Sequence, residues 1–114
     1  MYLTYYDIFT RNAFTNYGDV LREVIHSALM GEMLTFYDGT SSEYSWQNYR
    51  EVQFADENFA RELLQLFTVG FHILNKDGTH MIEDGQRVLT YNNDDIMELA
   101  RGFTGFTRQK ARGK

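Results

Sequence analysis

The sequence contains no cysteine and no proline. The missing thiols exclude a disulfide framework, a thiol nucleophile and a thiolate metal site. No apolar run approaches the length of about 18 residues that a membrane span needs, and residues 1–7 lack the basic and then apolar start of a signal peptide. We therefore expect a soluble chain with no membrane span, and its compartment stays open.

Apolar side chains are plentiful enough for a folded core. The 114 residues are 43% hydrophobic and 16% aromatic, which argues against disorder and fits one domain at most. Residues 1–107 carry all 16 acids against seven bases, a formal charge of −9. Because such a body repels a phosphate backbone, we do not expect general nucleic-acid binding.

Residues 108–114 are expected to form a basic tail. We favour the reading that this tail is a solvated end, and an interaction arm is the alternative. Its four cationic side chains are Arg108, Lys110, Arg112 and Lys114.

Apolar spacing and capping signals predict a mainly α-helical core segment of about four helices. The first helix is expected over about residues 3–12. The second is expected to begin at Asn16 or Asp19, either of which can cap it, and to loosen at Gly31. Residues 37–39 read as a turn. The apolar stripe of the second helix comprises Leu21, Val24, Ile25, Ala28 and Leu29.

Residues 56–70 contain the clearest predicted helix. Asp56 is expected to be its N-cap, Glu57 places negative charge in the first turn, and Gly70 is expected to end it. The apolar stripe comprises Phe59, Leu63, Leu66 and Phe67, widened by Ala60 and Leu64.

Residues 39–55 are expected to be a long connection, because they are rich in serine, asparagine, glutamine and tyrosine. Tyr44, Trp46 and Tyr49 allow two readings. We favour packing of these rings onto the body, and the alternative is that they line a groove for a ligand or partner.

Residues 71–91 change to strand-like composition interrupted by two turn signals, at 75–78 and 83–85. A β-hairpin or an irregular β-excursion is therefore predicted between the last two helices. The fourth helix is predicted to begin at Asn92, with Asp95 completing a capping box. Its buried side is expected to comprise Ile96, Leu99, Ala100 and Phe103, with Gly102 or Gly105 closing it.

A polar cluster at the start of the third predicted helix is the candidate site. Glu57 and Arg61 stand in the order that favours an i, i+4 ion pair, and Glu62 lies beside them. Two carboxylates this close can share acid and base duties, although a surface ion pair is the reading that spacing favours. A third reading is a network that ties this helix to the fourth. The whole candidate network is Glu57, Asn58, Arg61, Glu62, Arg101 and Thr104.

No metal or cofactor site is predicted. An EF-hand alignment on Gly78 fails, because its first ligand position would be Ile73, which has no ligand atom. His26, His72 and His80 are scattered, and a pair of imidazoles facing across a hairpin lacks a fixed third ligand for zinc. The zinc-protease, nucleophile-elbow and P-loop motifs are absent from the sequence.

The segment DENFARELLQLFTVG at 56–70 resembles the hallmark of the domain of unknown function 1800 family, an E-N-[FY]-A-R-E-L core before a leucine-rich turn that ends in glycine. LNKDGT at 74–79, YNNDDI at 91–96 and ARGFTGF at 100–106 resemble further motifs of that family. Two positions depart from the pattern: Ala55 stands where members usually have proline, and Phe106 stands in place of a closing tryptophan.

The resemblance implies a mainly helical fold and supplies no reaction or catalytic residue. Members are several times longer and often begin with an export signal, so residues 1–107 look like a partial domain. We expect such a fragment to leave the apolar stripes of its second and third helices exposed.

Two roles stay open, and whether the protein is an enzyme is undecided. The first is a structural or interaction role, with missing parts of its own domain or another exported protein as partners. The second is a part in an exported enzyme, a hydrolase for example, with a polar site around Glu57, Arg61 and Glu62.

Overall fold

A computed structural model describes residues 2–107, and over these residues the chain is mainly α-helical, as predicted. A short antiparallel pair of strands lies between η1 and α6, in the position predicted for the β-excursion. The basic tail predicted at 108–114 lies outside the described residues. The elements are α1 (Tyr2–Arg11), α2 (Tyr17–Ile25), α3 (Ala28–Met33), α4 (Ser42–Tyr49), α5 (Asn58–Glu62), the π-helical turn η1 (Leu63–Phe67), β1 (Ile82–Glu83), β2 (Gln86–Arg87) and α6 (Asn93–Arg101).

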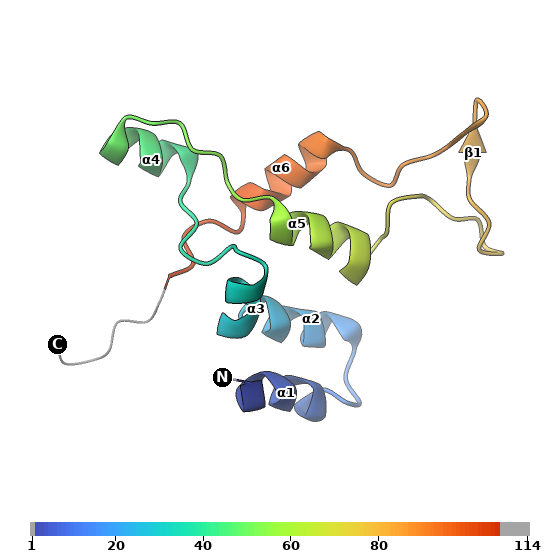
Figure 1. The fold of residues 1–114 in the computed structure, drawn as a ribbon. Helices are drawn as coiled ribbons and strands as arrows, with labels where there is room; N and C mark the ends of the chain where they lie inside the picture. The colour runs from blue at the N-terminus through green and yellow to red at the C-terminus, as the bar shows by residue number, and fades with distance from the viewer. Residues whose placement is uncertain (1, 108–114) are drawn as a thin grey trace.

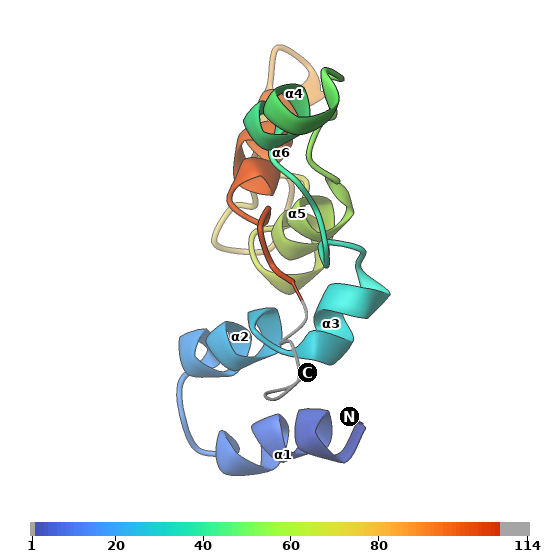
Figure 2. The same ribbon diagram turned by 90° about the vertical axis from the view of Figure 1, so that its left-hand side faces the viewer.

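The body is flat, with extents of 60 × 43 × 16 Å. Figure 1 shows α5 and α6 in the middle, with α1 and α2 below them, α4 above and the β-excursion to one side. The view in Figure 2, turned by a quarter, shows these elements stacked in a narrow column. The radius of gyration is 17.6 Å, against about 13 Å for a compact chain of this length. Many helix faces are therefore left without a neighbour.

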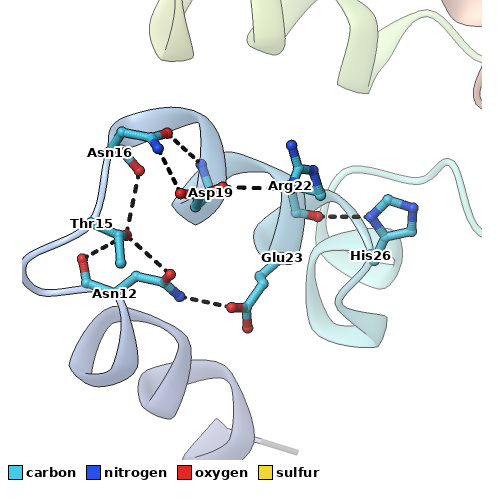
Figure 3. Close-up of polar contacts among 7 residues, drawn as sticks. All are labelled: Asn12, Thr15, Asn16, Asp19, Arg22, Glu23 and His26. Atoms are coloured by element: carbon cyan, nitrogen blue, oxygen red, sulfur yellow. Dashed lines mark hydrogen bonds and ion pairs between the residues drawn. The ribbon is translucent and has the colours of Figure 1, made fainter.

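The corner between α1 and α2 is fixed by side-chain hydrogen bonds, drawn in Figure 3. Asn12, which is buried, donates to the Ile8 carbonyl over 2.8 Å and to Glu23 Oε1 over 2.9 Å. Asn16 caps α2, as predicted, by accepting from the Asp19 backbone N–H. The hydrogen bonds from Asn12 and then Arg11 hold the pKa of Glu23 below its ordinary value.

The predicted second helix is divided in two. Ser27 lies between α2 and α3, where its hydroxyl donates to the Val24 carbonyl over 2.8 Å and accepts from the Met30 N–H at 3.2 Å. A serine that bonds the backbone in this way competes with helix continuation. Val24 and Leu29 are buried as expected, but Ala28 is exposed.

The predicted connection at 39–55 contains the helix α4, so the expectation of a loop there was wrong. Ser41 caps α4 by accepting from the Tyr44 N–H at 3.2 Å, and Arg50 ends it in the left-handed conformation at φ +57°. The predicted packing of the three rings was also wrong, because Tyr44, Trp46 and Tyr49 are 50%, 50% and 65% exposed.

The third predicted helix begins two residues after Asp56, at Asn58. Glu57 occupies the N-cap position, so the expectation that Asp56 is the N-cap was wrong by one residue. The Asp56 carboxylate still accepts from the Asn58 N–H at 2.8 Å. Gly70 ends the segment as expected, with φ +73° and its N–H donated to the Leu64 carbonyl.

The last turn of this segment, η1, is π-helical rather than α-helical. A π turn holds more residues than an α turn, so the side chains that follow it point in new directions. Phe59 and Leu63 are buried, but Leu66 is 67% exposed, and its predicted place in the apolar stripe was wrong.

The β-excursion is irregular. Beyond the two strands, single bridges join His72 to Leu89 and Leu74 to His80. The two imidazole rings lie in edge contact, with centroids 5.1 Å apart. Turns fall at both predicted places, with Gly78 at φ +84° and Gly85 at φ +78°.

The start of α6 matches its prediction. Asn92 accepts from the Asp95 N–H while the Asp95 carboxylate accepts from the Asn92 N–H, which completes the capping box. Ile96 and Ala100 are buried at 2% and 1% exposure. Gly102 is the C-cap residue, as expected.

Two apolar clusters meet at α5. Phe59 lies fully buried between Phe36 and Phe103, with ring centroids 4.4 and 4.7 Å away. The next residue, Ala60, belongs to the second cluster, whose other buried members are Tyr91, Ile96 and Ala100. One short helix thus holds both clusters together.

The expected exposure of two apolar stripes is met in part. Leu66 on the third predicted helix is exposed, but Val24 on the second is buried and its neighbours Leu21 and Ile25 are half-buried. The larger exposed apolar face belongs to α1, where Leu3 is 81% exposed.

Replacing the N-cap residue of α6 tests how much its capping hydrogen bonds contribute to stability. We expect Asn92→Ala to lower the free energy of unfolding by about 1 kcal/mol, because two backbone N–H groups lose their acceptor. The control is Asn93→Ala at the next, exposed position, which we expect to change stability by less than about 0.5 kcal/mol. Urea titration followed by circular dichroism measures both, and equal effects would contradict the capping role.

Candidate functional site

The first half of the predicted polar network, formed by Glu57, Asn58, Arg61 and Glu62, runs from the N-cap of α5 to its last residue. Arg61 Nη2 and Glu57 Oε1 are 2.6 Å apart, and the two side chains are 34% and 39% exposed. Asn58 points its amide toward the loop after α3 and donates to Thr35 Oγ1 over 3.3 Å. The pairing expected from the spacing is therefore present as an i, i+4 ion pair.

The second half of the network stays on its own helix. Arg101 pairs with Glu98 at 2.8 Å, with both side chains about 70% exposed, and Thr104 donates its hydroxyl to the Arg101 carbonyl. Within residues 2–107 no ion pair or hydrogen bond joins Arg101 or Thr104 to α5. The contact between the two helices is apolar and runs through Ala60 and Ala100.

Tyr91 is a residue of this region that the sequence analysis missed. Its ring is buried at 8% exposure and stacks on Phe71 with centroids 5.7 Å apart. Burial raises the pKa of Tyr91, the charge of Arg61 opposes that shift and the charge of Glu62 adds to it. The phenol thus lies in the electrostatic field of the polar cluster on α5.

A capping signal would have found Tyr91. It stands at the N′ position of α6, and Ile96 stands at N4, which is the spacing of a hydrophobic staple. The Tyr91 hydroxyl and the neighbouring Thr90 hydroxyl are buried without a hydrogen-bond partner among the described residues. Most buried polar groups have a partner, so these two are exceptions.

Several hollows indent the described surface, and four of them have volumes between about 160 and 450 Å³. The polar hollow has a volume of about 400 Å³ and is lined by Thr35, Tyr37, Asp38, Gly39, Thr40, Tyr49, Gln53, Phe54 and Asp56. An adjoining hollow of about 420 Å³ shares Asp38, Gly39 and Thr40 and is completed by Ser41, Tyr44 and residues 104–107. Two more lie near α1, one of about 450 Å³ beside the Arg11–Glu23 pair and an apolar one of about 160 Å³.

Neither Arg61 nor Arg101 is in the lining of any of these four hollows. Of the three exposed rings on α4, Tyr49 lines the polar hollow and Tyr44 lines the adjoining one, whereas Trp46 contacts Arg50. The polar cluster on α5 and the larger openings are therefore separate features.

Residues 2–107 contain neither a cluster of metal-ligating side chains nor a membrane-spanning helix. No set of three or more His, Cys, Asp or Glu side chains is grouped closely enough to hold a metal ion. No helix in this part of the chain has the length and apolar character to cross a bilayer.

Comparison with known families gives one match, which spans residues 1–114 and is described as "Protein of unknown function (DUF1800)". The chain therefore belongs to this family, as the motifs at 56–70 and 91–106 had indicated. Neither the curated proteins nor the solved structures gave a match.

Removing the Tyr91 hydroxyl tests its lack of a partner. We expect Tyr91→Phe to leave the free energy of unfolding unchanged or to raise it by up to about 1 kcal/mol, because an unpaired buried hydroxyl is destabilising. The control is Tyr17→Phe, which removes a hydroxyl that donates to the Phe67 carbonyl and is expected to lower stability by about 1 kcal/mol.

We also expect Tyr91→Phe to change how the free energy of unfolding depends on pH. Since the pKa of Tyr91 is raised in the folded state, the unfolded phenol ionises first, near its ordinary value of 10.0. Stability is fully present below that pH and is lost as pH rises toward the raised pKa. We expect Tyr91→Phe to show a shallower loss above pH 10 in urea titrations, and an unchanged slope would contradict the burial of the phenol.

Proposed function

We propose that this chain has an interaction role and pairs with a second copy of itself through the outer face of α1. The supporting observation is that α1 is apolar on both sides. Tyr5 and Ile8 pack inward against the core cluster, while Tyr2, Leu3 and Tyr6 on the outer side are 68%, 81% and 66% exposed. A helix that carries apolar side chains on two sides is normally covered on both of them.

The surface area supports a partner of substantial size. The chain exposes 8802 Å², whereas a compact monomer of 13.4 kDa exposes roughly 6500 Å². Obligate dimers bury about 2000 Å² or more in total between the two chains. The excess exposed surface of one chain, about 2300 Å², is therefore within the range of about 1000–2500 Å² that each chain contributes to an obligate dimer.

Charge favours α1 as the meeting point of two identical chains. Residues 1–107 carry a charge of −9, so two copies repel each other over most of their surface. α1 contains one acid, Asp7, and one base, Arg11, and is therefore neutral. α1 also lies at the edge of the body, with α2 as its neighbour (Figure 1). A contact between the α1 helices of two copies, related by a two-fold axis, therefore brings the chains together with the least electrostatic repulsion.

Sedimentation equilibrium of the 114-residue chain tests this role. We expect a dimer whose association strengthens as salt is added, because salt screens the repulsion between the two acidic bodies. Leu3→Glu is expected to weaken association by about 10-fold or more, since it places a charge in the apolar contact. Thr4→Glu, which adds the same charge to a neighbouring exposed position, is the matched control and is expected to have a much smaller effect.

A wild-type chain that stays monomeric at every concentration would refute the pairing. So would α1 amides that become protected from hydrogen exchange only when a different polypeptide is added. A folded Leu3→Glu variant that remains as dimeric as Thr4→Glu would move the contact away from α1.

A further inference from the structure

We propose that the polar hollow, between the end of α3 and the start of α5, is a binding site for a neutral oligosaccharide. This inference goes beyond the interaction role and uses none of the residues of α1. It rests on the chemistry of the lining, on the geometry of one carboxylate and on two exposed rings.

The lining of the polar hollow limits the class of ligand. It contains two carboxylates, Asp38 and Asp56, and no Lys, Arg or His side chain, so a phosphate or carboxylate ligand is repelled. A purely apolar ligand would strip water from the carboxylates and from the hydroxyls of Thr35 and Thr40 without replacing its hydrogen bonds. A ligand with many uncharged hydroxyls satisfies these groups, and that is the chemistry of a saccharide.

The Asp56 carboxylate is held in a fixed orientation at the wall of the hollow. Its Oδ2 accepts from the Thr35 hydroxyl and its Oδ1 from the Asn58 N–H, both over 2.8 Å. Each carboxylate oxygen accepts about two hydrogen bonds, so both retain capacity for a ligand hydroxyl. Thr35 reaches Asp56 from a backbone φ of +59°, a conformation that β-branched residues rarely adopt.

A second polar pair, Thr40 and Gln53, also lines the hollow. The Thr40 hydroxyl contacts Ser45 Oγ at 2.9 Å and Gln53 Oε1 at 3.3 Å. These contacts fix the carbonyl side of the Gln53 amide. The polar groups are thus ordered before a ligand arrives, which lowers the entropy lost on binding.

Two aromatic rings line the hollow and stay largely in water. Tyr49 is 65% exposed and Phe54 is 70% exposed, and neither belongs to an apolar cluster of the body. A sugar ring has an apolar C–H face that can cover such a ring, which removes both surfaces from water. Exposed rings beside fixed carboxylates and hydroxyls supply both kinds of contact that a sugar needs.

The size of the site fits several sugar units. A volume of about 400 Å³ lies within the range of about 300–1000 Å³ for small-molecule sites. The adjoining hollow of about 420 Å³ lies against the same segment, Asp38 to Thr40, and adds Tyr44 and the hydroxyls of Ser41 and Thr104. The lining of both hollows together therefore suits an oligosaccharide better than a single sugar.

The test is a ¹H–¹⁵N NMR titration of the 114-residue chain with maltotetraose, cellotetraose and tetraacetylchitotetraose. We expect at least one of these neutral tetrasaccharides to shift the amides of residues 35–40 and 53–56. Tyr49→Ala is expected to raise the Kd of that sugar about 5-fold to 10-fold through loss of the ring. Asp56→Asn is expected to raise it about 10-fold through loss of a charged acceptor.

Trp46→Ala is the matched control, because Trp46 is another exposed ring on the same helix and lines neither hollow. We expect this variant to bind the sugar as the wild type does, with circular dichroism confirming that all variants fold. The proposal is overturned if none of the three sugars shifts these amides. It is also overturned if Trp46→Ala and Tyr49→Ala weaken binding equally, or if spermidine shifts the amides and the sugars do not, which would assign the hollow to a cation.

Discussion

The structure depends on the packing of the Phe59 ring between the rings of Phe36 and Phe103. These rings come from the loop after α3, from α5 and from the segment after α6, so the contact joins three parts of the chain that are distant in sequence. In a flat body few other contacts can replace it. Because Ala60 enters the second cluster, α5 is the element that both clusters share. This dual use explains why the phenylalanine and the alanine of the NFARE segment are the two fully buried residues of α5.

The charged residues of the same segment have a different role. Glu57 and Arg61 pair across one turn on the half-exposed side of α5, away from Phe59. A pair this exposed contributes little to stability by itself, typically under about 1 kcal/mol. The effect of the pair is local, because it joins two residues one turn apart on this short helix. Arg101 repeats the arrangement on α6 with Glu98, so each helix carries its own pair.

Elements whose signals lie within a few residues could be predicted from the sequence. Elements that depend on which of two alternative interactions forms could not. The capping box at Asn92 and the glycines of the β-excursion act within a few residues, so the sequence displays them. The predicted second helix is divided at Ser27 because the Ser27 hydroxyl bonds the backbone rather than water. The apolar stripe of the sequence continues across this position, so it does not indicate the division. α4 was missed because its eight residues have no apolar stripe and only Ser45 is buried.

The same distinction applies to the candidate sites. The ion pair on α5 could be read from a spacing of four residues, but the polar hollow could not be read from any spacing. Thr35 and Asp56 are 21 residues apart and meet because Thr35 takes a positive φ that its residue type does not favour. The sequence left a groove lined by Tyr44, Trp46 and Tyr49 as an open alternative. Tyr44 and Tyr49 line the two hollows, whereas Trp46 lines neither.

The π turn η1 has a consequence for how this segment tolerates insertions and deletions. Each residue of an α-helix turns the chain by about 100°, so a surplus residue in a regular α-helix would rotate everything beyond it by that amount. The π turn Leu63–Phe67 absorbs such a residue, because it closes one turn with more residues than an α turn does. Losing one residue here would therefore let the α-helix run on with the β-excursion in about its present direction, so this segment is a place where the chain can change its length by one residue.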